Sequence, residues 1–342
     1  MSRIKTAAAA ALAGWAAVRL LRTRRYDFTG KTVLVTGGSR GLGLVLAKHL
    51  AAEGARVAIC GRDPDALERA RSSLVAIGVE VLALPADVAD REAVATLVRR
   101  VEERLGPIDA LVNNAGVIEV GPAETMTLAD YQEAMDVNFW GVVHPTLAVL
   151  PAMRQRRQGR IVNITSIGGR IGVPHLVPYS ASKFAAYGFS QGLRAEERRH
   201  GVVVTTAVPG LMRTGSPRNA TFRGRHRAEY AWFSIADSLP GLTIDAEEAA
   251  RRILEAARRG AAEVRFPAIA RLAAIAGAAA PGLMAATLEL TARLLPAPPP
   301  SRDERRAGRE SQSAVSPSWL THLGDQAARR YNQIAPSEGA NA

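Results

Sequence analysis

Cysteine is almost absent from this chain of 342 residues, in which Cys60 stands alone. A single cysteine excludes an internal disulfide framework and fits a reducing compartment. We therefore expect a cytoplasmic protein in which Cys60 is a small buried residue on a strand. The sequence also lacks zinc-finger spacings and the aromatic signature of RNA-binding sheets. We expect neither a nucleic-acid partner nor a bound metal.

Acidic residues are missing from the first 25 positions, which carry six of the cations behind the formal net charge of +12. These cations are Arg3, Lys5, Arg19, Arg22, Arg24 and Arg25. Because half of the charge excess lies in this terminal arm, the rest of the chain is only mildly basic. The distribution is a further argument against nucleic-acid binding.

The arm has no apolar run long enough to cross a bilayer. Its uninterrupted apolar stretch, Ala7–Val18, has twelve residues, and as a helix it would cover about 18 Å of a hydrocarbon core about 30 Å thick. No convincing small-residue cleavage site follows it, as one would in a secretory signal. Two interpretations stay open: a helix lying on the anionic inner surface of a membrane, or an alanine-rich helix without a partner.

From Lys31 onward, short apolar runs alternate with longer segments of helical periodicity. The predicted strands are Thr32–Thr36, Arg56–Cys60, Val79–Leu84, Ile108–Asn113, Gly159–Thr165 and Val202–Val208. The predicted helices are Leu42–Glu53, Pro64–Ile77, Arg91–Leu105, Leu128–Arg156, Ser180–His200 and Ala246–Arg259. The strands are rich in Val and Ile without strict alternation, which indicates burial on both faces. This order predicts an α/β fold with a doubly wound parallel sheet, the Rossmann fold.

Changes in composition divide the chain into four parts. We expect a basic apolar arm at residues 1–25, a single Rossmann-fold domain at 26–266, apolar helices at 267–295 and a tail at 296–342. The tail is rich in proline and charge and is expected to be partly disordered, with one short amphipathic helix. That helix either docks back on the domain, which we favour, or recruits a partner.

The segment between the first strand and the first helix reads TGGSRGLG, residues 36–43. Gly37 lets the chain turn sharply, Gly41 lets the backbone approach a diphosphate, and Gly43 lets the helix pack closely on the sheet. The helix N-terminus adds unpaired N–H groups and a positive dipole. The loop therefore predicts a dinucleotide-binding site.

The end of the second strand indicates which dinucleotide is bound. Proteins that bind NAD usually carry an acidic residue there for the ribose 2′-hydroxyl. Here the strand runs into Arg62, and a second cation, Arg40, lies in the glycine-rich loop. Two guanidinium groups suit a 2′-phosphate, whereas Asp63 should belong to the following helix. We expect NADP(H), with NAD less favoured.

Tyr179 and Lys183 are four residues apart in a predicted helix, so they share one face. A free tyrosine has a pKa of about 10, and a nearby ammonium together with the positive nicotinamide of an oxidised cofactor would lower it. Ser166 follows a predicted strand and can hold a substrate carbonyl. These residues predict proton transfer beside the cofactor.

In combination, the motifs between Lys31 and Phe266 resemble those of the short-chain dehydrogenase/reductase family. The matching segments are TGGSRGLG (36–43), Asp87-Val88, Asn113-Asn114-Ala115-Gly116, Asn138 within DVNFWG, Ser166, YSASK (179–183) and Pro209-Gly210 followed by Thr214. The four catalytic positions of the family are all present as Asn138, Ser166, Tyr179 and Lys183.

The resemblance implies a set of cofactor contacts: Gly37, Gly38, Ser39, Arg40, Gly41, Leu42, Gly43, Arg62, Asp87, Val88, Asn114, Tyr179, Lys183 and Thr214. Among these, Asp87 would contact the adenine and Asn114 would lie near its ribose. Thr214 would contact the nicotinamide carboxamide or the diphosphate.

The resemblance also implies the catalytic roles. Ser166 and Tyr179 would contact the substrate, and Lys183 would bind the nicotinamide ribose. Asn138 would hold a water molecule that continues a proton relay from Lys183.

The family places its substrate lid between Pro209 and Thr243. Aromatic residues of this segment, Tyr230, Trp232 and Phe233, would form an apolar wall. Its five arginines, at 213, 218, 223, 225 and 227, either bind an anionic handle such as an acyl carrier or form a solvated face.

We therefore expect a homo-oligomeric enzyme that transfers a hydride between NADP(H) and a hydrophobic ketone or aldehyde, or the matching secondary alcohol. The alternative is a non-catalytic protein that binds NADPH as a sensor or a scaffold, either free or tethered to a membrane. A pure sensor has no need of the intact catalytic set, which speaks against this alternative.

Overall fold

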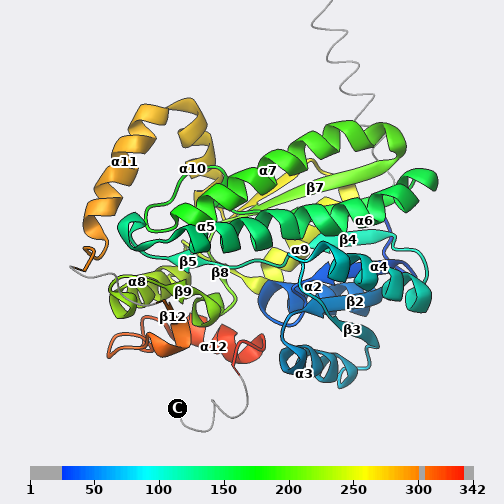
Figure 1. Ribbon diagram of the computed structural model, residues 1–342, viewed down its shortest axis with the longest axis horizontal. Helices are drawn as coiled ribbons and strands as arrows, with labels where there is room; N and C mark the ends of the chain where they lie inside the picture. Colours follow the sequence, from blue (N-terminus) through cyan, green and yellow to red (C-terminus); the bar gives the residue numbers. More distant parts are fainter. Residues whose placement is uncertain (1–24, 300–304, 335–342) are drawn as a thin grey trace, which may run out of the picture.

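The computed structural model describes residues 25–299 and 305–334. Almost all of the predicted N-terminal arm therefore lies outside the described residues. The strands of the main sheet are β1 (Thr32–Thr36), β2 (Arg56–Gly61), β3 (Val81–Pro85), β4 (Ala110–Asn113), β6 (Gly159–Ile164), β7 (Val202–Pro209) and β11 (Glu263–Phe266). They pair in parallel in the order β11-β7-β6-β4-β1-β2-β3 (Figure 1). The predicted doubly wound parallel sheet is confirmed.

The strand order reverses between β1 and β4, which pair with each other although β2 and β3 lie between them in the chain. In open α/β sheets, ligands bind outside the carboxyl ends of the strands at such a switch point. The residues that follow β1, β4, β6 and β7 therefore meet at one edge. This topology brings together motifs that are far apart in the sequence.

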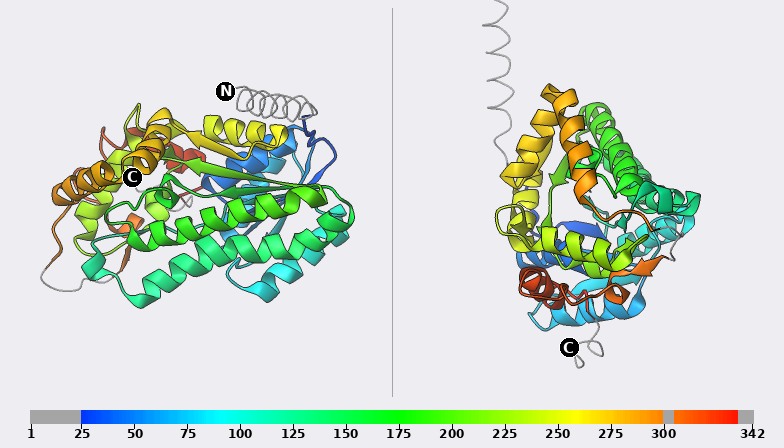
Figure 2. Two further views of the ribbon diagram at one scale, coloured as in Figure 1. Left: turned by 90° about the horizontal axis from the view of Figure 1, so that it is seen from above. Right: turned by 90° about the vertical axis from the view of Figure 1, so that its left-hand side faces the viewer.

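The helices of the structure are α2 (Gly41–Ala52), α3 (Pro64–Val75), α4 (Arg91–Leu105), α5 (Leu128–Met135), α6 (Gly141–Gln155), α7 (Val177–Glu197), α8 (His226–Ser238), α9 (Ala246–Arg259), α10 (Ala268–Ala279), α11 (Pro281–Leu294) and α12 (His322–Arg330). Helices α2, α3 and α9 cover one face of the sheet, and α4, α6 and α7 cover the other (Figures 1 and 2). Central strands are buried on both faces, as their Val- and Ile-rich sequences predict. Cys60 lies fully buried on β2.

Two elements differ from the sequence-based expectation. The predicted helix at 128–156 is interrupted by a π-helical turn, Asp136–Trp140, between α5 and α6. A seventh strand, β11, pairs with β7 at the edge of the sheet. Its sequence, EVRF, is short and polar at alternate positions, so it lacks the apolar run that identified the other strands.

A small sheet lies beyond the carboxyl edge of the main one. It joins β5 (Glu119–Val120), β9 (Thr221–Phe222) and β12 (Arg306–Ala307), three dipeptides from distant parts of the chain. A second pair consists of β8 (Met212–Arg213) and β10 (Ile244–Asp245). Two-residue strands carry no periodic signal, so sequence patterning could not predict them.

The C-terminal segment 305–334 returns to this edge. Helix α12 packs beside α8 and β8 (Figure 1). Close contact is possible because Gly215 has no side chain: a Cβ there would lie 2.3 Å from the Cα of Ala328. Residues 305–318, where we expected a disordered linker, include β12 and a 3-10 turn at Gly308–Glu310.

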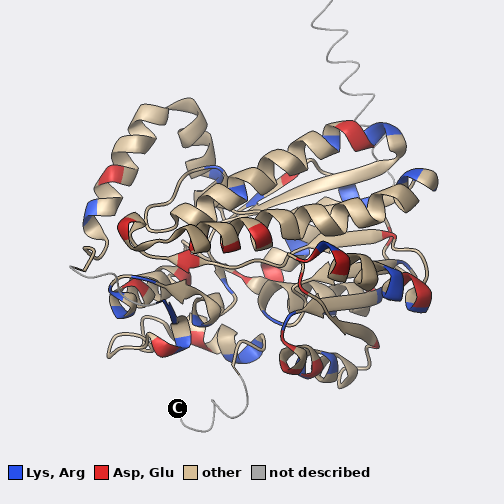
Figure 3. Cartoon of the chain, viewed as in Figure 1, with Lys and Arg blue, Asp and Glu red and all other residues tan. Residues whose placement is uncertain are grey.

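Helices α10 and α11 project from the body as a hairpin (Figure 2). Leu283, Leu290 and Leu294 on α11 are exposed, and few charges interrupt this hairpin in Figure 3. Among the described residues, no helix is both long and apolar enough to cross a membrane.

Candidate functional site

The glycine-rich loop joins β1 to α2 in a conformation that requires glycine. Gly37 and Gly41 have φ values of 63° and 55°, which side chains rarely adopt. At Gly43 a Cβ would lie 2.1 Å from the carbonyl oxygen of Gly37. The backbone of the helix therefore lies directly against the backbone of the loop.

No side chain caps the N-terminus of α2. Its N-cap residue, Arg40, makes no side-chain hydrogen bond to the helix, and the first turn holds no acidic residue. The N–H groups of a first helical turn lack partners within the helix and carry the positive end of its dipole. Such a terminus can bind a diphosphate.

A cavity of about 360 Å³ lies against this helix end. Of the residues proposed from sequence, it is lined by Gly37, Ser39, Arg40, Gly41, Leu42, Arg62, Asp87, Val88, Asn114, Ser166, Tyr179, Lys183 and Thr214. Gly38, Gly43 and Asn138 are not among its lining residues. The structure thus brings the loop, the strand ends and the tyrosine–lysine pair to one cavity.

The three side chains expected to contact substrate or move a proton lie close together. Tyr179 and Lys183 are on α7, and Lys183 Nζ is 5.7 Å from the centre of the Tyr179 ring. The Ser166 hydroxyl is hydrogen-bonded to the Tyr179 side chain and accepts a hydrogen bond of 3.0 Å from the N–H of Gly168. The ammonium of Lys183 donates to the Ile164 carbonyl at 3.3 Å.

Burial controls the acid–base state of this pair. Desolvation raises the pKa of Tyr179 to about 12 and lowers the pKa of Lys183 to about 8, because a low-polarity site disfavours the charged form of each group. We expected the ammonium to lower the tyrosine pKa. That expectation included the positive nicotinamide of an oxidised cofactor; in the protein alone the largest influence on the Tyr179 pKa is desolvation, which favours the protonated phenol.

Asn138 lies within the π-helical turn and is fully buried. Its side chain exchanges two hydrogen bonds of 3.0 Å with the backbone of Val117 and donates a third to Ser182. A π-helical turn adds a residue to a helix, commonly at a functional site. Here Asn138 fixes the segment after β4 against α7.

The side chains of Asn114 and Asp63 form hydrogen bonds with nearby backbone groups. The Asn114 amide donates to the carbonyl oxygens of Thr36 and Gly37, both at 3.1 Å. One oxygen of Asp63 accepts the N–H groups of Asp65 and Ala66. Asp63 therefore caps α3, as the sequence suggested.

Sequence reasoning missed Glu119 on β5. Its side chain is 2 % exposed, and its two oxygens accept no hydrogen bond within the described part of the chain. Desolvation, with a contribution from Glu133, raises the pKa of Glu119 to about 8. An ionised Glu119 would raise the pKa of both Tyr179 and Lys183. In the sequence, the only feature that marks Glu119 is that it is an acidic residue inside an apolar run.

The predicted aromatic wall lies next to the catalytic tyrosine candidate. Tyr230 and Phe233 form a buried cluster with Val120, Leu176, Ala220 and Phe222, and Tyr179 and Trp232 pack against it. None of the five lid arginines is among the described residues that line the cavity. Arg223, for example, pairs with Asp130 at 2.8 Å.

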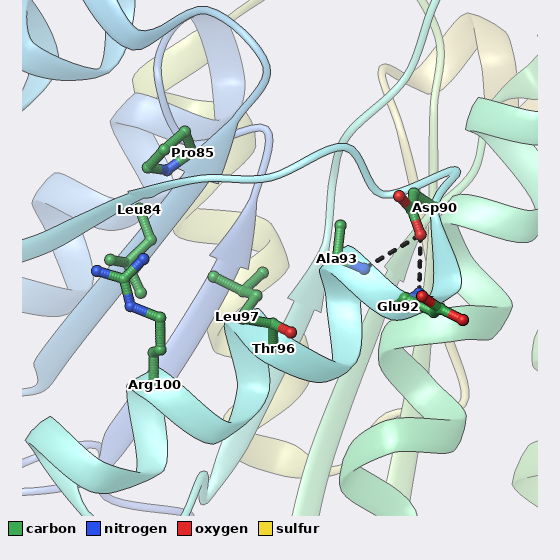
Figure 4. A pocket seen from close by; sticks show the side chains of 8 residues that line it. All are labelled: Leu84, Pro85, Asp90, Glu92, Ala93, Thr96, Leu97 and Arg100. Atoms are coloured by element: carbon green, nitrogen blue, oxygen red, sulfur yellow. Dashed lines mark hydrogen bonds between the residues drawn. The ribbon is translucent and has the colours of Figure 1, made fainter.

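A second hollow, of about 310 Å³, lies between β3 and α4 (Figure 4). Asp90, its acidic residue nearest the helix start, caps α4 by accepting the N–H groups of Glu92 and Ala93. None of the proposed catalytic residues lines it. The described residues also contain no group of three or more His, Cys, Asp or Glu that could hold a metal ion.

Comparison with known proteins finds related sequences for more than half of the chain. The profile of the family described as short chain dehydrogenase matches residues 31–222. A candidate ketoacyl reductase of Streptomyces coelicolor is 37% identical over 250 residues, which cover 70% of this chain and 94% of that protein. Gluconate 5-dehydrogenase of Gluconobacter oxydans is 37% identical over 189 residues, 55% of this chain and 74% of its own length.

Solved structures agree with the fold. A gluconate 5-dehydrogenase from Burkholderia cenocepacia, in complex with NADP and tartrate, aligns with a TM-score of 0.64 at 27% sequence identity. The alignment covers 73% of this chain and 98% of that one.

Proposed function

The chain belongs to the short-chain dehydrogenase family, whose members are oxidoreductases that bind nicotinamide cofactors, and we propose that it is an NADP(H)-dependent reductase of hydrophobic ketones or aldehydes. One observation carries this proposal: Ser166, Tyr179 and Lys183 line the same cavity as the uncapped N-terminus of α2. A carbonyl held there would lie beside both a proton donor and a dinucleotide.

The residues of the site fit a nicotinamide dinucleotide. Gly41 presents backbone without a side chain to the cavity, and the N-terminus of α2 can bind the diphosphate. Asp87, Asn114 and Thr214 would bind the adenine, its ribose and the nicotinamide end. When bound, the cofactor supplies or accepts the hydride.

This chain's residues supply the remaining chemistry. Ser166 holds the substrate oxygen by a hydrogen bond, and Tyr179 donates its phenolic proton to that oxygen as the carbonyl is reduced. Lys183 binds the nicotinamide ribose and stabilises the phenolate that forms. Asn138 anchors the neighbouring backbone and holds the water through which the proton is replaced.

Preference for NADP(H) rests on the charges around Arg40. Burial lowers the pKa of Arg40, the nearby carboxylate of Asp63 raises it, and the cations Arg69 and Arg62 lower it, so several guanidinium groups lie close together here. The competing carboxylate, Asp63, caps α3 with one oxygen and lies 3.8 Å from Arg40 with the other, so a 2′-phosphate would compete with it for this guanidinium. A 2′-phosphate would relieve the repulsion among the arginines and accept their hydrogen bonds. The Burkholderia relative was solved with NADP.

We expect Arg62→Ala to weaken NADPH binding by about ten- to a hundredfold and to leave NADH binding almost unchanged. A hydrogen bond to a charged group contributes about 1.5–3 kcal/mol, and only NADPH carries the phosphate that makes it. Fluorescence titration of both cofactors measures the two affinities. Arg71→Ala is the matched control, since Arg71 lies on α3, the helix that follows Arg62, and pairs with Glu68. Equal losses for NADPH and NADH would exclude the 2′-phosphate assignment.

The proposed substrate class rests on the apolar cluster beside Tyr179. Turnover tests it: with NADPH and a panel of apolar and polar ketones and aldehydes, cofactor absorbance should fall fastest with the apolar ones. NADPH binding without turnover of any carbonyl would favour the alternative of a sensor or scaffold.

We also propose that the N-terminal arm binds anionic membrane surfaces, since its sequence combines six cations with twelve apolar residues. A protein that begins at Arg25 keeps the ion pair of Arg25 with Glu255 and the hydrogen bond from Tyr26 to Arg258. We expect this truncation to fold and to stay in solution with anionic vesicles, whereas the full chain should sediment with them at low salt and be released at high salt. Equal sedimentation of both proteins would contradict the proposal.

A further inference from the structure

The C-terminal segment reaches the cofactor cavity through three consecutive residues, Tyr331–Gln333. We call these three residues the strap. They follow directly after α12. The carbonyl of Tyr331 accepts a hydrogen bond of 2.8 Å from the N–H of Gly41, at the start of α2. Tyr331 itself is 4 % exposed and packs in the main core, which anchors the strap.

Asn332 attaches the strap to the adenosine side of the site. Its amide donates to the carbonyl oxygens of Ser39 at 2.7 Å and Ala66 at 2.9 Å, and its oxygen accepts from Arg69 Nε at 3.0 Å. The residue has a φ of 58°, a left-handed conformation that asparagine tolerates better than most residues. One side chain thus joins the strap to the glycine-rich loop and to α3.

Gln333 attaches the strap to the loop after β7 that carries Thr214. Its amide donates to the carbonyl oxygen of Thr214 at 3.0 Å, and its side-chain oxygen accepts from Asn219 at 2.7 Å. Asn219 in turn accepts from Arg40 at 2.8 Å. Gln333 lines the cavity and is 9 % exposed.

We propose that the strap closes the cofactor site over the diphosphate and slows the release of the dinucleotide. It joins the glycine-rich loop, which carries Gly41, to the loop that carries Thr214, and both loops line the cavity. Gln333 lines a cavity of about 360 Å³ rather than filling it, so the strap acts as a cover. The inference rests on the proposed function only in taking a nicotinamide dinucleotide as the ligand.

Stopped-flow measurement of cofactor dissociation from Gln333→Ala tests this role. The change removes two hydrogen bonds between the strap and the segment of Thr214 and Asn219, and each contributes about a threefold factor. We expect NADPH and NADH both to dissociate about tenfold faster, because both contain the diphosphate, while their association rates change little. Gln326→Ala is the control, since the Gln326 amide lies on α12 and contacts His322 on the exposed surface.

Asn332→Gly provides a second variant, because glycine keeps the left-handed backbone while removing the amide. It too should accelerate dissociation, and thermal unfolding establishes that each variant is folded. Hydrogen exchange of the peptide that contains the strap should slow when cofactor is added to the wild-type protein.

Dissociation rates that match wild type in both variants would overturn the proposal. So would faster association with tighter binding, which would make the strap an obstruction rather than a cover. These measurements need no turnover, so a failure to find a substrate would leave them intact. A loss of affinity for NADPH but not for NADH would instead assign the effect to the site proposed for the 2′-phosphate, around Arg40 and Arg62.

Discussion

Tyr179→Phe is expected to lower kcat for carbonyl reduction by about 10²–10⁴-fold while the affinity for cofactor stays almost unchanged. The substitution removes the phenolic proton, and a positioned acid–base group typically contributes that factor. The ring keeps its place in the apolar cluster beside the cavity, so the loss should reflect chemistry rather than packing. Steady-state kinetics and cofactor titration measure the two quantities.

Tyr187→Phe is the matched control. Tyr187 lies two turns further along α7, where its hydroxyl donates to Glu263 at 2.9 Å. The same atom is removed from the same helix, away from the cavity, and turnover should persist. A Tyr179→Phe variant that retained more than about a tenth of wild-type kcat would contradict the role of the phenol as proton donor.

The main sheet could be predicted from the sequence because its central strands are buried on both faces. Runs such as TVLVT at β1 and VVVTTAVP at β7 are rich in apolar and β-branched residues, and this composition identifies them as buried strands from the sequence alone. The glycine-rich loop was predictable for a related reason: the close approach of Gly43 to Gly37 admits no side chain. Local constraints of this kind are visible in the sequence.

Contacts between distant segments were not predictable in the same way. Gln333 and Thr214 are 119 positions apart, and nothing in the C-terminal sequence indicates that it meets the glycine-rich loop. Individual hydrogen bonds of the Asn332 and Gln333 side chains hold the strap in place, and no periodic apolar face is involved in these contacts. Such contacts depend on the tertiary fold, which sequence periodicity does not specify.

The acid–base state of the site depends on burial for the same reason. The spacing of Tyr179 and Lys183 shows that they share a helix face, but their burial depends on neighbours from other elements, such as the aromatic residues of α8 that pack beside Tyr179. Desolvation there raises the pKa of Tyr179 to about 12 and lowers that of Lys183 to about 8. These directions lead to a kinetic expectation.

Between pH 6 and 8, we expect kcat/KM for alcohol oxidation to rise about a hundredfold and that for carbonyl reduction to change little, with both cofactors well below saturation. Oxidation needs the phenolate, whose fraction rises about tenfold per pH unit below the pKa of Tyr179. Reduction needs the protonated phenol, which prevails throughout this range because that pKa is about 12. Lys183 stays largely charged up to its pKa of about 8.

The two directions are linked, since oxidation releases one proton and reduction consumes it. The ratio of their kcat/KM values must therefore change about tenfold per pH unit, and the pKa of the free enzyme decides which direction carries the change. Initial rates at several pH values separate the cases. If reduction falls tenfold per unit from pH 6 while oxidation stays flat, then Tyr179 is already ionised at neutral pH. That result would mean that the charge of Lys183 outweighs desolvation in this site, as its spacing from Tyr179 alone had suggested.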